Sequence, residues 1–148
     1  MRFSDLSKDQ VITTRAYTMT EAEILAFARQ YDPQWFHVDA ERARAGRWKG
    51  LIASGWHTGA VAMRLAVEDI LEGSEAFGAP GLDHLRWLAP VRPGDVLRLR
   101  ARVVDKRVSA SARTGAIDWY WTVVTADDQP VLELTATTLF ELQPKPVD

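Results

Sequence analysis

The sequence predicts an α+β domain in which an antiparallel sheet curls around one long helix. The first observation is an apolar stretch between Gly50 and Gly73, which holds no Asp, Glu, Lys or Arg from Leu51 to Met63. Such a run is too long for a core strand and too short to cross a bilayer, so it indicates a buried helix. The second observation is a series of four strand patterns after residue 80, separated by turn residues. Consecutive strands favour antiparallel pairing, and a helix rich in small residues favours close packing against a sheet.

Composition limits the classes of protein that the chain can be. At 148 residues it fits one domain, residues 1–148, with a core at about residues 10–142. The formal net charge is −2, with 26% charged residues, which argues against a nucleic-acid partner and against disorder. The absence of cysteine excludes disulfides, thiol nucleophiles and cysteine-ligated zinc. The first ten residues lack the apolar core of a signal peptide and no stretch is long enough for a membrane anchor, so we expect a cytoplasmic protein without a membrane partner.

The N-terminal third should contain a strand and a helix. Val11–Met19 has a strand pattern, and Thr20 is a good N-cap because acidic residues follow it in the first helical turn. The helix should run about three turns, by the usual length of such a pattern. It should end near Tyr31, since Pro33 disfavours helical geometry in the residue before it.

Residues 32–50 follow as a segment that we call the overhang. Asp-Pro, Ala-Gly and Lys-Gly steps interrupt it, with room for a helical turn over Ala40–Ala45. We predict that the overhang is ordered, because four of its side chains can be buried: Trp35, Phe36, Val38 and Trp48.

The central helix has recognisable ends and one apolar face. Ser54 is a suitable N-cap, and Gly73 a suitable C-terminal stop. Charged residues gather toward the C-terminal end, so the first half should be enclosed and the second half should reach water. The predicted apolar face consists of Trp56, Ala60, Met63, Val67 and Ile70.

The remaining chain should form the sheet. Residues 73–81 are expected to be a loop, and Asp127–Pro130 a hairpin turn. The tail, residues 143–148, has two prolines and no apolar pattern. The predicted strands are Leu82–Leu88, Val96–Lys106, Ile117–Thr125 and Val131–Leu142.

Two features could carry chemistry. Asp32 and His37 lie five residues apart on a segment that we expect to be irregular, and a carboxylate and an imidazole held there can share one water molecule. The alternative is a turn aspartate and a half-buried histidine.

At the start of the central helix, free N–H groups point outward and Gly55 lets a carbonyl oxygen approach the backbone, as enolate stabilisation requires. The alternative there is purely structural, since every buried helix must begin somewhere.

Three further patterns are weaker. Ser54 and His57 could meet on one helix face as a nucleophile and its base, but the chain has no G-x-S-x-G elbow. We expect no metal, because the candidate ligands match no closed set of spacings: His37, Asp39, His57 and His84. A basic run could meet phosphate groups or form solvated surface; it comprises Arg42, Arg44, Arg47 and Lys49.

These motifs, in this order, resemble the MaoC-like dehydratase family, relatives of the (R)-specific enoyl-CoA hydratases, over roughly Tyr17–Leu142. The family pattern Asp-x-Asn-Pro-x-His corresponds here to Asp-Pro-Gln-Trp-Phe-His at residues 32–37, where Gln34 replaces the asparagine and Trp35 the proline. Ser54 occupies the place where many members have a histidine before the glycine. Further stretches similar to family signatures are Val38–Asp39, Gly50–Trp56 and Leu88–Asp95.

The resemblance implies a hot-dog fold, a homodimer with active sites near the subunit interface, and an acyl-CoA thioester substrate, with no cofactor. Water would add to an enoyl-CoA, or leave a 3-hydroxyacyl-CoA, as in fatty acid metabolism. Asp32 and His37 would be the catalytic pair, and the Gly55 N–H would take the thioester oxygen. The substrate would also contact Ser54, Trp35 and Trp56, with the two indoles limiting chain length.

Some alternatives stay open at this point. A hot-dog thioesterase would use the same helix terminus with a carboxylate acting at the carbonyl, and a non-catalytic protein would bind acyl-CoA without turnover. Trp119 and Trp121 share one strand face, which predicts core packing first and lining of an acyl pocket second.

Overall fold

The computed structural model describes residues 1–142, so the predicted tail lies outside the described residues. The elements in chain order are η1 (Phe3–Asp5), β1 (Val11–Thr13), β2 (Tyr17–Thr18), α1 (Glu21–Tyr31), α2 (Trp35–Val38), α3 (Ala40–Ala45), α4 (Gly55–Ala66), η2 (Val67–Leu71), β3 (Ala76–Gly78), β4 (Leu82–Trp87), β5 (Val96–Val108), β6 (Thr114–Thr125) and β7 (Pro130–Glu141). No helix within these residues has the length and apolar character needed to cross a bilayer.

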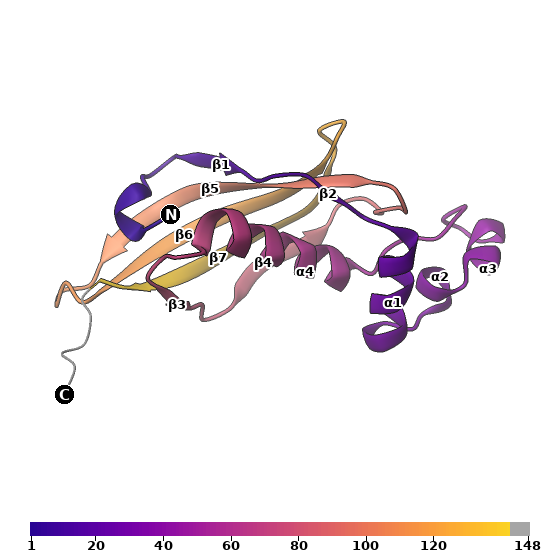
Figure 1. Cartoon of the computed structure of the whole chain (residues 1–148), viewed down its shortest axis with the longest axis horizontal. Coiled ribbons are helices and arrows are strands. Elements are labelled where there is room, and N and C mark those ends of the chain that lie inside the picture. The colour runs from indigo at the N-terminus through magenta and orange to yellow at the C-terminus, as the bar shows by residue number, and fades with distance from the viewer. Residues whose placement is uncertain (143–148) are drawn as a thin grey trace.

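The strands form one antiparallel sheet that covers a single long helix. The strand order is β1-β5-β6-β7-β3, while β2 also pairs with β5 and β4 with β7. Figure 1 shows α4 lying along the sheet, with α1, α2 and α3 gathered beyond one end of it. The sheet curled around a helix is therefore confirmed, together with the four long strands in the second half of the chain.

Alternation along the strands builds the core. Buried side chains facing α4 come from β5 and β6: Leu97, Leu99, Ala101, Val103, Ile117, Trp119, Trp121 and Val123. The Trp119 indole N–H donates to the Thr138 hydroxyl at 3.0 Å, which satisfies that polar atom inside the core. The predicted core packing of both tryptophans is confirmed.

The face of α4 that meets the sheet differs from the predicted one. Of the predicted face only Ile70 is buried, and Trp56 is 59% exposed. The buried side chains of α4 are instead His57, Thr58, Val61, Ala62, Leu65 and Ala66. The prediction followed the largest side chains of the helix, whereas its buried face carries mostly small and medium-sized residues and the sheet supplies bulk through Trp119 and Trp121.

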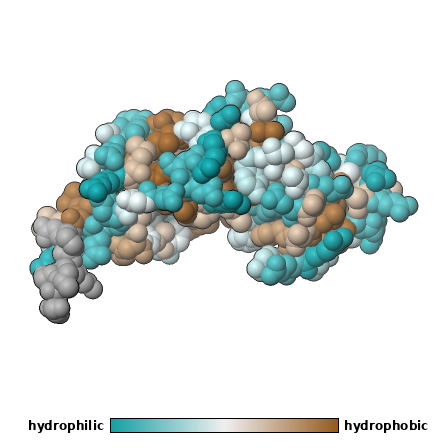
Figure 2. Space-filling model, in the orientation of Figure 1, coloured by the Kyte–Doolittle hydropathy of each residue, from teal (hydrophilic) through white to brown (hydrophobic). Residues whose placement is uncertain are grey.

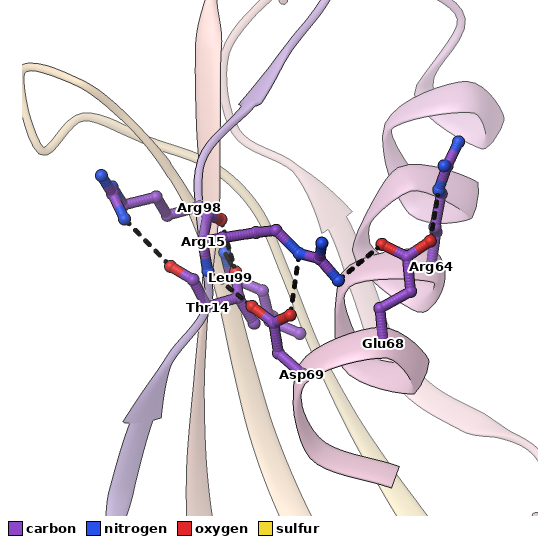
Figure 3. A network of polar contacts seen from close by, with 7 residues as sticks. All are labelled: Thr14, Arg15, Arg64, Glu68, Asp69, Arg98 and Leu99. Carbon is purple, nitrogen blue, oxygen red and sulfur yellow. Dashed lines mark hydrogen bonds and ion pairs between the residues drawn. The ribbon is translucent and has the colours of Figure 1, made fainter. Parts of the chain in front are cut away.

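The N-terminal strand is divided, which corrects the prediction of one strand over Val11–Met19. The Thr14 N–H donates to the Leu99 carbonyl at 2.9 Å, and the Thr14 hydroxyl accepts the Leu99 N–H at 3.0 Å. A side chain thus replaces a main-chain acceptor, and regular pairing stops between β1 and β2. Figure 3 shows Arg15 at this break reaching Glu68 and Asp69 at 2.9 and 2.8 Å, so the interruption is tied to the end of the central helix.

Four smaller predictions have clear outcomes. The Thr20 hydroxyl accepts the Glu23 N–H at 3.2 Å, which confirms the N-cap of α1. The helical turn over Ala40–Ala45 is confirmed as α3. The expected loop over residues 73–81 is wrong in part, because β3 forms there and pairs with β7. The overhang also contains the one-turn helix α2, where we expected irregular chain.

A β-bulge shapes the edge strand β4. His84 has a φ of +53°, and the pairing with β7 shifts register between Asp83 and Arg86. One extra residue reverses the alternation of the strand. Leu82 and Leu85 therefore both face the cavity beside α4, although they are three positions apart along the strand.

Candidate active site

The overhang holds one histidine beneath the start of the central helix. Pro33 precedes α2, and this short helix buries His37 so that 5% of it is exposed. The chain then returns as an extended, buried segment: the Ile52 N–H donates to the Phe36 carbonyl at 3.2 Å, and the Ala53 N–H donates to the Val91 carbonyl at 2.8 Å. These bonds fix the residues before α4 against the overhang.

The two predicted catalytic side chains meet. His37 Nε2 lies 3.3 Å from Asp32 Oδ2, and His37 Nδ1 lies 2.7 Å from the Ile52 carbonyl oxygen. Because a carbonyl can only accept, Nδ1 carries a proton, and Nε2 is the nitrogen that faces the carboxylate. The hydrogen bond to Ile52 thus fixes the orientation of the ring.

Asp32 is hydrogen-bonded on both oxygens. The Ser54 hydroxyl donates to Oδ2 at 2.7 Å, and the Gln34 side-chain amide donates to Oδ1 at 2.8 Å. Burial raises the pKa of Asp32, but the bonds from Ser54 and Gln34 and the nearby His37 outweigh it, so the pKa lies below its ordinary value. The carboxylate is therefore ionised at neutral pH.

Ser54 has a different role from the predicted N-cap. It occupies the N-cap position of α4, but its side chain makes no capping hydrogen bond and is fully buried against Asp32. A Ser54–His57 nucleophile pair has no support, since the hydroxyl donates elsewhere. The His57 ring instead stacks on Phe27 with centroids 4.7 Å apart, and its Nδ1 has no partner among the described residues.

A cavity of about 300 Å³, which we call the reaction cavity, is lined by His37 but not by Asp32. Its mostly apolar wall includes His37, Trp48, Ala53, Gly55, Thr58 and Trp87. A side chain at the first position of α4 would displace the Trp87 indole, because a Cβ on Gly55 would lie 2.3 Å from it. The described residues supply no backbone acceptor for the Gly55 N–H, so this first donor of the helix is free for a ligand.

The other predicted substrate residues lie apart from the reaction cavity. Trp35 packs against Gly46, and the Arg42 guanidinium lies 4.5 Å from its ring centroid. Trp56 contributes to a different cavity on the exposed side of α4. The sequence did not predict that Trp48 and Trp87 line a cavity. For Trp87 the only local indication was its position at the end of a predicted strand, directly before Leu88-Ala89-Pro90. No cluster of three potential metal ligands occurs in residues 1–142.

Sequence comparison finds relatives for most of the chain. The family profile described as "MaoC like domain" matches residues 2–125. The uncharacterized protein YdeM of Bacillus subtilis is 34% identical over 107 residues, which cover 72% of this chain and 76% of that protein. The 3-hydroxyacyl-thioester dehydratase Z of Mycobacterium tuberculosis is 37% identical over 89 residues, and this match spans 59% of each protein.

Solved structures give the same picture of the fold. A MaoC-like dehydratase from Rhodospirillum rubrum superposes with a TM-score of 0.87 at 32% identity, covering 96% of this chain and 97% of that one. A Mycobacterium tuberculosis protein described as a double hotdog fold superposes with a TM-score of 0.81 at 24% identity, covering 98% of this chain and 46% of that one. The sheet wrapped around α4 is therefore a hot-dog fold.

Proposed function

Because the chain belongs to the MaoC-like domain family, we propose that it is a hydratase or dehydratase acting at the Asp32–His37 pair. It would add water to an enoyl thioester or remove water from the 3-hydroxyacyl thioester. The observation that carries this proposal is the 3.3 Å approach of His37 Nε2 to Asp32 Oδ2, with the imidazole forming part of an apolar cavity wall. The name of one relative, a 3-hydroxyacyl-thioester dehydratase, supports the same reaction class.

The geometry suits the addition of water. A water molecule that contacts both the carboxylate and the imidazole from one side would lose one proton to the pair as its oxygen bonds to the β-carbon. The pair then returns one proton to the α-carbon, so both groups end the cycle in their starting state. Negative charge develops on the thioester oxygen in between. The free Gly55 N–H, at the positive end of the α4 dipole, would stabilise that charge.

We infer that coenzyme A carries the acyl group. Trp48 lines the reaction cavity, and exposed Arg47 and Lys49 flank it in the chain. Arg92 adds a third cation there by donating from Nη2 to the Trp48 carbonyl at 2.6 Å. Figure 2 shows that the outer end of the overhang is largely hydrophilic. These basic side chains would form ion pairs with the nucleotide phosphates of coenzyme A.

We also propose a homodimer. Trp56 and Met63 of α4 and Val67 of η2 expose apolar side chains, and Leu82 of β4 is exposed as well. Within the described residues β4 pairs only with β7, so its other edge is free for a second copy. Exposed apolar surface next to a strand with one unpaired edge is typical of a protein interface.

The test is a panel of enoyl-CoA esters, followed by loss of the enoyl absorbance. Asp32→Asn and His37→Ala should each lower kcat by about 10² or more with little change in KM, because proton transfer is lost while ground-state binding remains. The double variant should be hardly slower than either single one. Folded variants with near-normal rates would exclude the pair, release of free thiol would indicate a thioesterase, and binding without turnover a non-catalytic protein.

A further inference from the structure

Two apolar cavities lie on either side of Gly55. The reaction cavity and a second cavity each have a volume of about 300 Å³, and Gly55 lines both. The second cavity lies between the exposed face of α4 and the bulged strand β4. Its lining is almost entirely apolar and includes Trp56, Gly59, Met63, Leu82, Leu85 and Trp121.

Two indoles separate these cavities. Trp87 lines only the reaction cavity and Trp56 only the second cavity. Their rings meet edge to face, with centroids 5.3 Å apart and an interplanar angle of 77°. The Trp87 indole also lies directly against Gly55, at the place where a Cβ would approach within 2.3 Å. The partition is thus one side chain from β4 supported by one from α4.

We propose that Trp87 determines acyl-chain length by closing the reaction cavity beside Gly55, which restricts the enzyme to short-chain enoyl thioesters. This inference rests on the proposed hydratase function. The reaction cavity is at the small end of the range for ligand pockets, which is about 300–1,000 Å³. Once the thioester lies near Gly55 and His37, the space left for further methylene groups ends at the indole.

The second cavity is the space that a longer chain would enter without the indole. It adjoins Gly55, where the thioester oxygen would bind, and offers an apolar wall to a hydrocarbon tail. Each methylene group that moves from water into such a space improves binding about fourfold. Removing Trp87 should therefore change chain-length preference more than it changes the rate on the shortest substrate.

The experiment compares kcat/KM from crotonyl-CoA to decenoyl-CoA. The wild type should favour crotonyl-CoA, and Trp87→Ala should shift the preference toward longer chains by about fourfold per added methylene. A second substitution, which fills the second cavity, then tests whether the longer chain enters that cavity. A Cβ at Gly59 would meet nothing within 4 Å, so Gly59→Leu can extend into the second cavity and should abolish the gain in the Trp87→Ala background. Trp35→Ala, which removes an indole outside both cavities, is the matched control and should keep the wild-type profile.

The outcomes separate this inference from the proposed function. If the wild type hydrates crotonyl-CoA while Trp87→Ala and the milder Trp87→Leu keep its chain-length ratios, the partition proposal is wrong and the hydratase assignment stands. If no ester is hydrated, the function fails, and calorimetric titration with butyryl-CoA and decanoyl-CoA still tests the partition. A Trp87→Ala or Trp87→Leu protein that gains no affinity for decanoyl-CoA relative to butyryl-CoA would overturn it.

Discussion

Replacing Ser54 with alanine should weaken the candidate site in a pH-dependent way. The Ser54 side chain is fully buried and donates to Asp32 Oδ2 at 2.7 Å, so no water can take its place without rearrangement. A hydrogen bond to a charged group contributes about 1.5–3 kcal/mol. Its loss should raise the pKa of Asp32 toward its ordinary value. In the proposed mechanism the ionised carboxylate is the active form, so the acid limb of kcat/KM should move to higher pH.

The assay is crotonyl-CoA hydration between about pH 3 and pH 7, a range that includes the ordinary pKa of an aspartate, with unfolding followed in parallel. The stability that a depressed carboxyl pKa contributes is present above the unfolded pKa and lost on acidification, so Ser54→Ala should be less stable at neutral pH. Gln34→Ala is the matched control: it removes the other donor, but Gln34 is exposed, so water replaces its bond and the shift should be smaller. An unchanged acid limb in folded Ser54→Ala would refute the reasoning.

Three other predictions concern the interface, a buried histidine and the carrier. Met63→Glu places an unpaired charge in the proposed interface and should convert dimers to monomers in sedimentation; a wild-type monomer at micromolar concentration would contradict the dimer. Burial lowers the pKa of His57 although nearby Glu23 acts to raise it. Neutral His57 therefore favours the folded state above the ordinary pKa of histidine, and this contribution to folding stability is lost on acidification. The melting temperature of His57→Phe should therefore fall less than that of the wild type between about pH 7 and pH 5. Equal decreases in the two proteins would contradict this role of His57. Arg47→Gln combined with Lys49→Gln should raise KM for crotonyl-CoA roughly fivefold, the effect of about 1 kcal/mol, but leave KM for crotonyl-pantetheine unchanged.

Local chemistry made much of the fold predictable. Thr20 caps α1 through a bond to a residue three positions away, and the turn between β6 and β7 closes where Asp127–Pro130 indicated it. The Asp32–His37 spacing was also visible, because one turn of α2 brings the two together. Each of these features depends on neighbours within a few residues.

The missed features depend on distant contacts. The Ser54 hydroxyl serves a carboxylate 22 residues earlier in the chain rather than its own helix. Two faces of α4 carry apolar residues at helical spacing, and the strand residues that pack against one of them decide which face is buried. Trp87 reaches Gly55 only because β4 pairs with β7 beside the helix and carries a bulge at His84. Local periodicity cannot encode such encounters.

The three departures from the family pattern acquire a common physical meaning at Asp32. Gln34, in place of asparagine, still presents an amide donor and reaches Oδ1 at 2.8 Å. Ser54, in place of histidine, supplies the second donor to Oδ2. Trp35 replaces proline at the first residue of α2, a position where proline is favoured but its fixed φ is not required for a helix. Since each substituted residue keeps a donor or a helix start in position, the departures are compatible with the proposed Asp32–His37 pair, and any change of substrate should arise from the cavity walls at Trp48 and Trp87.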